Sequence, residues 1–212
     1  AEHGHRGAAS YAMARRRELA AALALAGLAP DQVVLLGLPD QEVAEQMPVL
    51  ARRLAAMCRT RGIDVVITHA MEGGHPDHDA VAFAVRAAAA LADRDGYPIA
   101  VLEMPFYRRG PSGWLHQSFV PDRRSPATDV RLSDDEIALK RSMLAAHASQ
   151  RATLAQFPVH VERFRPATPI DVTILPNDGA LLYELYDWGL TGERWLALTG
   201  LACRTLGLGP VL

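Results

Sequence analysis

The stretch that decides the fold is VVITHAMEGGHPDHD, residues 65–79. It begins with a short apolar run, passes two adjacent glycines, and ends in a proline followed by ionisable side chains. A short apolar run between loop residues is typical of a strand buried on both faces, as in a parallel sheet. Proline at the first position of a helix sacrifices no hydrogen bond. We therefore predict a strand over 65–68 and a helix over 76–93.

Further predicted helices and strands alternate on both sides of this stretch. Strong helix formers fill residues 10–26, and apolar residues spaced three and four apart predict a helix over 39–61. Apolar runs at 33–36 and 99–102 predict two more strands. Strands that alternate with helices indicate right-handed crossovers and a parallel sheet. The expected fold class is α/β, a Rossmann-like three-layer sandwich with a mostly parallel sheet and helices on both faces.

The second half of the chain is less regular. Pro, Gly, Arg and Ser dominate residues 105–131, which we expect to be either a lid or binding loop or a disordered surface excursion. Ser133 and Glu136 fit a capping box that starts a helix running toward residue 155. Residues 159–164 alternate like an edge strand, and the tail at 181–212 is aromatic and helical in character.

Composition narrows the classes of function. The 212 residues suit one domain, and a net charge of −2 argues against a nucleic-acid partner. No apolar run approaches the roughly 20 residues that span a bilayer, and two cysteines are too few for a disulfide framework. No Gly-x-Gly-x-x-Gly loop supports dinucleotide binding. We expect a cytoplasmic protein, in which Trp188 and Trp195 pack internally or form a homo-oligomer contact rather than a sugar platform.

The candidate site lies at the start of the helix over 76–93. His75 and His78 are three residues apart, so their side chains are neighbours on one helical turn at the carboxyl end of a strand. Asp77 and Asp79 can orient such rings by accepting their second N–H. This pattern is either part of a metal or catalytic site or simply a well-formed helix start, because Pro and Asp suit a first turn. Two histidines do not complete a catalytic zinc site, which takes three protein ligands.

The segment GGHPDH after a strand ending in ITH closely resembles the second signature of the LmbE/PIG-L family of deacetylases. Four other segments resemble family motifs and occur in the family's order. Three precede GGHPDH, namely EHGHRG at 2–7, RRREL at 15–19 and LPD at 38–40, and a lysine with HASQ between 140 and 150 comes after it. The resemblance covers about residues 1–150. It implies a single LmbE/PIG-L-like domain over 1–212, with a core at 1–150 and a C-terminal extension at 151–212.

The resemblance also implies an activity. Family members are zinc-dependent hydrolases that remove an acetyl group from an N-acetylated amino sugar or a similar small-molecule amide. By this likeness His78 is a ligand of Zn²⁺, and His75 is the neighbouring acid or oxyanion stabiliser that Asp77 holds in place. Arg15 and Asp40 are the candidate substrate contacts.

One family signature is missing. Ala-His-Pro-Asp-Asp-Glu, which supplies two zinc ligands and the general base, does not occur in residues 1–212. We expect the first β-α-β portion of the fold to lie upstream of Ala1. Gly73 also stands where some family members carry an aromatic residue. The alternative hypothesis is a non-catalytic scaffold or binding module that retains the fold without a complete zinc site.

Overall fold

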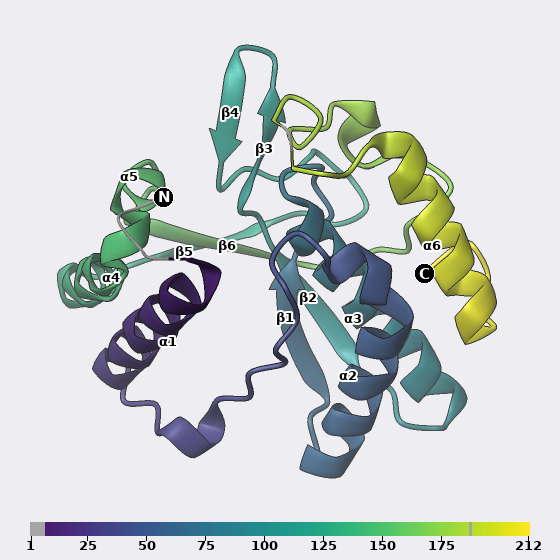
Figure 1. The fold of residues 1–212 in the computed structure, drawn as a ribbon, viewed down its shortest axis with the longest axis horizontal. Coiled ribbons are helices and arrows are strands. Elements are labelled where there is room, and N and C mark those ends of the chain that lie inside the picture. The colour runs from purple at the N-terminus through teal and green to yellow at the C-terminus, as the bar shows by residue number, and fades with distance from the viewer. Residues whose placement is uncertain (1–6, 187) are drawn as a thin grey trace. The chain divides into compact units, whose positions relative to one another are not determined.

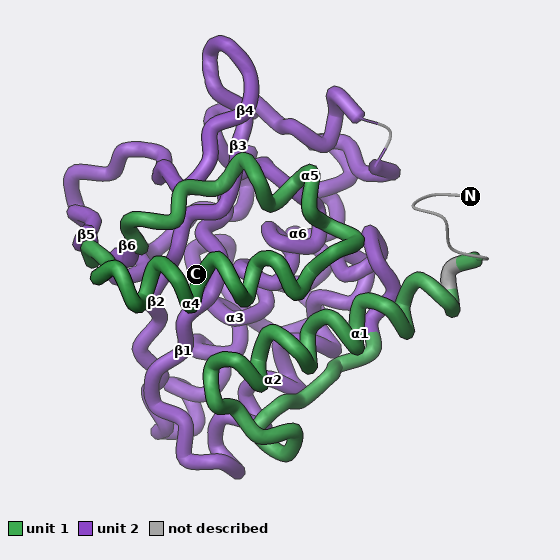
Figure 2. Tube along the Cα trace, turned by 90° about the vertical axis from the view of Figure 1, so that its left-hand side faces the viewer, with its two compact units in different colours: residues 1–37, 130–162 green, residues 38–129, 163–212 purple. Residues whose placement is uncertain are grey.

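The computed structural model describes residues 7–186 and 188–212, which form two compact units (Figures 1 and 2). Unit 1 comprises Ala1–Gly37 and Val130–Glu162, and unit 2 comprises Leu38–Asp129 and Arg163–Leu212. Residues 2–6 of the EHGHRG motif lie outside the described residues. The organisation as one domain with a core and an extension stays a prediction.

Unit 1 contains the helix that the residues before Gly27 predict and the helix that the capping box predicts. These are α1 (Ala8–Leu25) and α4 (Asp134–Ala146). At the start of α4, Ser133 Oγ accepts the N–H of Glu136, while the Glu136 carboxylate accepts the N–H of Ser133 at 2.7 Å. The prediction that this helix continues toward residue 155 is wrong. It ends at Ala146, and η4 (Ala148–Gln150) and α5 (Arg151–Leu154) follow as separate turns.

An ion-paired glutamate, Glu18, binds the turn that follows α4. Glu18 on α1 accepts the backbone N–H of Ser149 at 2.8 Å and its hydroxyl at 2.7 Å, and it pairs with Arg15 at 3.3 Å. Burial raises the pKa of Glu18, but these hydrogen bonds outweigh burial, so the pKa is lowered and the carboxylate is charged. The RRREL and HASQ motifs therefore hold α1 against the turn at 148–150.

The strand predicted over 33–36 does not form. Val34 and Leu35 are 42% and 53% exposed, and this segment has no regular structure. An apolar run becomes a strand only where a neighbouring strand completes its hydrogen-bond ladder. Hydrophobic pattern alone carries no information about that partner, and the prediction is wrong for this reason.

The main sheet has the order β1-β2-β6-β5. The two pairings made by β2 differ in direction: β1 and β2 are parallel, from Val65 opposite Ala100 to His69 opposite Met104, whereas β2 and β6 are antiparallel. The α/β class is confirmed, but a mostly parallel sheet is not. Of the predicted strands, those at 65–68 and 99–102 are confirmed, while the predicted edge strand lies between two others. The bounds are β1 Val65–His69, β2 Ala100–Met104, β5 Thr128–Arg131 and β6 Val161–Pro166.

Helices of unit 2 cover one face of the β1–β2 pair. On α3 (Pro76–Arg94) pack η3 (Val43–Gln46), α2 (Met47–Arg61) and α6 (Gly192–Leu206) (Figure 1). The strand residues on the α3 side, Thr68 and Glu103, are buried, whereas Val65 and Ile67 are 49% and 53% exposed. β1 is therefore not buried on both faces, and the three-layer arrangement is not confirmed for this unit. None of the helices in the described residues combines the length and hydropathy that crossing a membrane requires.

A β-hairpin occupies part of residues 105–131, for which the sequence predicts a lid or binding loop or a disordered surface excursion. It consists of β3 (Tyr107–Gly110) and β4 (Gly113–His116), which form an antiparallel sheet of their own. Arg108 fixes its base by donating to the carbonyls of Ser118 and Phe119 and to the side chain of Asn177. The hairpin is thereby tied to the segment that leads into residues 181–188.

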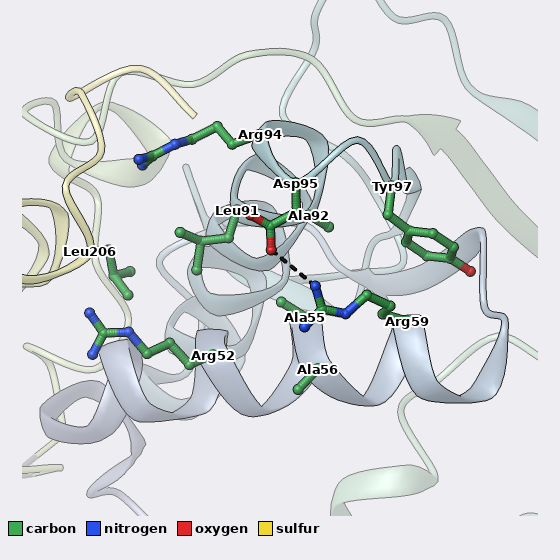
Figure 3. Close-up of a pocket in the computed structure, with 10 residues that line it drawn as sticks. All are labelled: Arg52, Ala55, Ala56, Arg59, Leu91, Ala92, Arg94, Asp95, Tyr97 and Leu206. Atoms are coloured by element: carbon green, nitrogen blue, oxygen red, sulfur yellow. Dashed lines mark hydrogen bonds and ion pairs between the residues drawn. The ribbon is translucent and has the colours of Figure 1, made fainter.

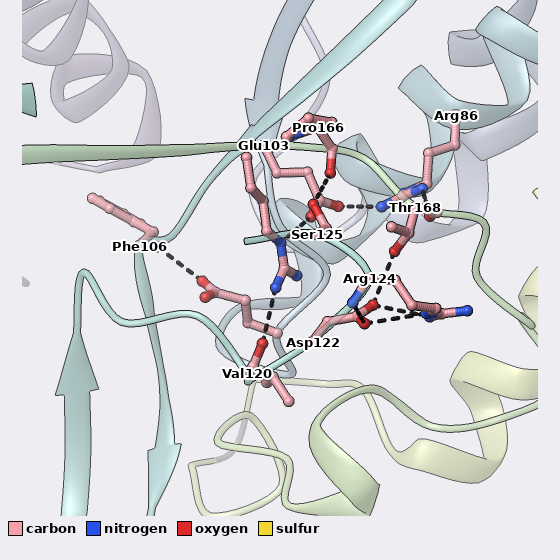
Figure 4. Close-up of polar contacts among 11 residues, drawn as sticks. Arg86, Glu103, Phe106, Val120, Asp122, Arg124, Ser125, Pro166 and Thr168 are labelled. Atoms are coloured by element: carbon pink, nitrogen blue, oxygen red, sulfur yellow. Dashed lines mark hydrogen bonds and ion pairs between the residues drawn. The ribbon is translucent and has the colours of Figure 1, made fainter. Parts of the chain in front are cut away.

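A buried ion network joins α3, β2 and β6 in unit 2. The Glu103 carboxylate pairs with Arg86 of α3 and, at 2.9 Å, with Arg165 of β6. Arg86 also donates to the Thr168 carbonyl at 2.6 Å (Figure 4). All three charged side chains are nearly inaccessible to solvent. Each charge therefore depends on the others, because a buried charge without a partner is costly.

We expect Glu103→Ala to destabilise unit 2 by about 3–5 kcal/mol, because it leaves two buried guanidinium groups unpaired. The matched control is Asp95→Ala, which breaks the exposed Arg59–Asp95 pair and is expected to cost less than about 1 kcal/mol. Urea unfolding of both variants provides the measurement. Equal losses in the two variants would contradict the structural role of the network.

Candidate functional site

The loop between β1 and α3 is closed by a buried aspartate. Asp79, which is 1% exposed, accepts the N–H of Glu72 at 2.9 Å and the N–H of Gly73 at 3.0 Å. Burial raises the pKa of Asp79 to about 7, although the two N–H donors act in the opposite direction. One side chain on the first turn of α3 thus fixes the backbone of the turn that precedes it.

The two glycines of this loop are required by close packing. A Cβ on Gly74 would lie 1.9 Å from the carbonyl oxygen of Tyr107 on β3. Gly73 has a φ of +67°, and a Cβ there would lie 2.8 Å from Leu181. The Gly73 carbonyl accepts the N–H of Leu182 at 2.7 Å. The turn therefore packs against both the hairpin and the 181–182 segment without any side chain of its own.

Three imidazole rings meet at this turn. The ring of His78 lies 4.4 Å from that of His69 and 4.8 Å from that of His75, measured between centroids, and Phe106 lies 4.9 Å from it. Burial is the main cause that lowers the pKa of each histidine: to about 4 for His69, well below the ordinary value for His78, and to a lesser degree for His75. The cluster is therefore neutral at pH 7. The structure brings together the predicted pair and His69, which ends β1.

His75 is oriented by backbone rather than by a carboxylate. Its Nδ1 accepts the N–H of Asp77 at 3.1 Å, which leaves Nε2 to carry the proton of the neutral ring. The Asp77 carboxylate instead accepts the N–H groups of Gln41 at 2.7 Å and Val43 at 3.2 Å. Burial raises the pKa of Asp77, and the charge and hydrogen bond of Asp40 add to this rise. Asp77 thus joins the start of α3 to the turn that carries Asp40.

The predicted substrate contacts occupy different units. Asp40 belongs to unit 2 and adjoins Asp77, whereas Arg15 belongs to unit 1, where it pairs with Glu18. Their contacts with substrate stay predictions, as do the catalytic roles of His75 and Asp77 and the metal-ligand role of His78.

Glu72 is a site residue that the sequence reasoning missed. It is 4% exposed, its Oε2 accepts the N–H of Phe106 at 2.8 Å, and burial raises its pKa to about 8. Within the described part of the chain, its Oε1 has no hydrogen-bond partner, and neither do Thr68 Oγ1 and His69 Nδ1. In the sequence, Glu72 is a glutamate that stands directly before two glycines, shortly after a predicted strand. A glutamate in this position is usually an exposed loop residue, and only the tertiary packing shows that Glu72 is buried.

The described residues do not complete a metal site. In residues 7–186 and 188–212, no group of three or more His, Cys, Asp or Glu side chains is arranged to hold a metal ion. A neutral imidazole such as that of His78 suits Zn²⁺, but a catalytic zinc takes three protein ligands. The ligand set that the described residues offer thus falls short of zinc binding.

Two cavities of unit 2 lie away from the histidines. One, of about 260 Å³, is bordered by α2, α3 and the end of α6 (Figure 3). Its arginines have structural partners: Arg52 donates to the carbonyl of Thr205 in α6, Arg94 donates to the carbonyl of Gly207 just after α6, and Arg59 pairs with Asp95. The other, of about 300 Å³, is lined mainly by small and apolar side chains beside Arg86. Neither cavity contains a residue of the histidine cluster.

The two tryptophans of the tail have different environments. Trp195 is fully buried, which confirms its predicted packing role. The ring of Trp188 lies 5.1 Å from that of His75. Trp188 is therefore a neighbour of the candidate site, which its sequence position did not indicate.

We expect Gly74→Ala to cost about 3 kcal/mol or more in stability, because its Cβ would overlap a backbone oxygen that cannot move aside. Gly200→Ala is the matched control. Gly200 lies within α6 and a Cβ there meets only the flexible end of Arg204 at 3.4 Å, so this variant should gain about 0.5–1 kcal/mol. Thermal and urea unfolding measure both, and a tolerated Gly74→Ala would contradict the close packing.

The pH dependence of stability tests the Asp79 environment. Since its pKa rises on folding from 3.8 to about 7, the folded state binds the extra proton between these values. Stability should therefore fall as pH rises from about 4 to about 7, by up to about 1.4 kcal/mol per pH unit. Asp79→Asn cannot titrate and should lack this component. Parallel stability profiles for the two proteins across this range would contradict the shift.

The chain was compared with family models, curated proteins and solved structures. The PIG-L family model, described as GlcNAc-PI de-N-acetylase, matches residues 1–89. No curated protein matches the chain. Among solved structures, the zinc-inhibited form of teicoplanin deacetylase Orf2 is similar, with 16% sequence identity and a TM-score of 0.47 over 74% of each chain. The predicted resemblance to the PIG-L family is thereby confirmed over residues 1–89.

Proposed function

We propose that this chain acts as an N-deacetylase-type hydrolase on an N-acetylated amino sugar or a similar small-molecule amide. The observation that carries the proposal is the neutral His75 at the carboxyl end of β1, held by the Asp77 N–H with its Nε2 left as a proton donor. The family match over residues 1–89 supports the same reaction class. The predicted cytoplasmic location and homo-oligomer contact stay predictions.

The reaction adds water across an amide. The carbonyl carbon gains a hydroxyl group, the carbon–nitrogen bond breaks, and the amine nitrogen takes the second proton. Such a reaction is accelerated by a donor placed at the carbonyl oxygen, where negative charge develops, and by an acid that protonates the leaving amine. His75 Nε2–H is suited to donate to that oxygen. Asp40, on the turn fixed by Asp77, is the proposed contact for a substrate hydroxyl, and Arg15 is the second proposed contact.

Zinc dependence is the part of the proposal that rests on family resemblance. Zinc supplies a Lewis acid and an activated water when it is bound in enzymes of this kind. His78 is the proposed ligand from this chain. The alternative of a scaffold or binding module without a complete zinc site stays a prediction.

Release of free amine from methyl N-acetyl-β-glucosaminide tests the function. The purified chain is assayed with and without added zinc, and its zinc content is measured in the same preparation. We expect His75→Gln to lower kcat roughly 100-fold or more with little change in KM, because Nε2–H acts on the transition state. His160→Gln, an exposed position in unit 1, is the control and should retain full activity.

The outcomes separate the two hypotheses. A folded chain that releases no amine under either condition contradicts the hydrolase and favours the scaffold. Activity that His75→Gln leaves intact contradicts the assigned role of His75. About one tightly held zinc per chain would show that ligands exist beyond those that the described residues bring together.

A further inference from the structure

One cavity of unit 2 gathers three arginines at the end of α3 that lies away from the histidine cluster. It is the cavity of about 260 Å³ that α2, α3 and the end of α6 border (Figure 3). Arg52 and Arg59 come from α2 and Arg94 from the last turn of α3, while Asp95 and Tyr97 follow that helix. We call this space the arginine cavity.

The lining of the arginine cavity carries an excess of positive charge. Three guanidinium groups and the carboxylate of Asp95 line it, which gives a formal charge of +2, whereas the whole chain has a net charge of −2. Asp95 pairs with Arg59 at 3.2 Å and so offsets one of the three cations. Positive groups that converge on a concave surface raise the local concentration of anions. The charge of the lining therefore favours an anionic ligand.

The end of α6 fixes two of the arginines. Arg52 Nη2 donates to the Thr205 carbonyl at 2.8 Å, and Arg94 Nη1 donates to the Gly207 carbonyl at 3.1 Å. Both side chains lie on the Leu206 side of the cavity (Figure 3). A guanidinium group has five N–H donors in a rigid plane, so one bond to a carbonyl leaves others for a ligand. Groups held in this way bind an anion at a lower entropic cost than mobile ones.

The lining between the charged groups is apolar. It includes Ala55, Ala56 and Leu91, and the ring of Tyr97 lies on the side opposite Leu206 (Figure 3). A bare inorganic anion would leave this surface in contact with water, whereas an organic group attached to the anion would cover it. Burial of apolar surface adds to affinity. The lining thus suits a ligand with an anionic head and an apolar body.

We propose that the arginine cavity binds a small phosphate monoester, with the phosphate between Arg52 and Arg94 and the organic group directed toward Tyr97. A phosphate monoester carries a charge between about −1.5 and −2 near pH 7, which matches the charge of the lining. Its oxygens accept paired N–H groups from the planar guanidinium fork. A carboxylate offers only one negative charge and fewer oxygens to the same donors.

The arginine cavity is distinct from the candidate active site. His78 lies on the first turn of α3 and Arg94 on the last, which places them about 24 Å apart along the helix axis. The proposed phosphate site is therefore independent of the proposed hydrolase function, and its test needs no catalytic activity.

Isothermal titration of phenyl phosphate into the whole chain, at low ionic strength, tests the proposal. We expect binding at one site, roughly tenfold tighter than that of inorganic phosphate because the ring covers apolar lining. Arg52→Gln and Arg94→Gln should each weaken it roughly tenfold, since each removes charge-assisted hydrogen bonds to the phosphate. Asp95→Asn should tighten it roughly threefold, because it removes the opposing carboxylate and releases Arg59.

Arg61→Gln is the matched control. Arg61 is an exposed arginine on the same helix as Arg52 and does not line the cavity, so its variant should bind within about twofold of the wild type. Unfolding midpoints establish that each variant is folded. The exposed Asp95→Asn keeps the test decisive if loss of a bond to the end of α6 unfolds an arginine variant.

Four results would overturn the proposal. They are the absence of phenyl phosphate binding, equal weakening by Arg52→Gln and Arg61→Gln, weaker binding in Asp95→Asn, and equal affinities for phenyl phosphate and inorganic phosphate. Cosedimentation with phosphatidate vesicles separates a soluble ester from a lipid headgroup. Vesicle binding without binding of phenyl phosphate would assign the arginines to a lipid surface and overturn the proposal as well.

Discussion

The carboxyl group of Asp79 is the constraint on which the site depends. It is fully buried and accepts two backbone N–H groups of the preceding loop, so it fixes the path from the end of β1 into α3. Gly74 then approaches the Tyr107 backbone more closely than any side chain would permit. A buried polar group that is fully hydrogen-bonded specifies a single conformation, because every alternative leaves it unsatisfied. The positions of His75 and His78 follow from that one conformation.

A second buried polar group, the carboxylate of Glu103, organises the sheet of unit 2 independently of Asp79. Glu103 stands on the helix-covered face of β2, where an apolar side chain would be expected, and is paired with arginines from α3 and β6. Pairs of this kind contribute little net stability relative to apolar packing, yet removing one partner is costly. We interpret this ion network as the interaction that selects which strand pairs with β2. β6 supplies Arg165 opposite Glu103 and enters the sheet antiparallel.

Burial also sets the chemistry of the candidate site. The histidine cluster is neutral because desolvation disfavours a charged imidazole, and the same effect raises the pKa of Glu72 to about 8. A neutral His75 with Nδ1 engaged is a directed hydrogen-bond donor rather than a diffuse positive charge.

The sequence by itself determined the local elements: the capping box at Ser133, the strand and helix that flank the GGHPDH segment, and the family to which that segment points. These depend on interactions between residues close in the chain, which pattern and propensity describe well. Tertiary structure alone decided the rest. Whether the run at 33–36 becomes a strand depends on a neighbouring strand, and the burial of Glu72 depends on packing around it. Trp188 reaches His75 across more than a hundred residues, a contact that no local pattern encodes because its energy comes from groups that only the fold brings together.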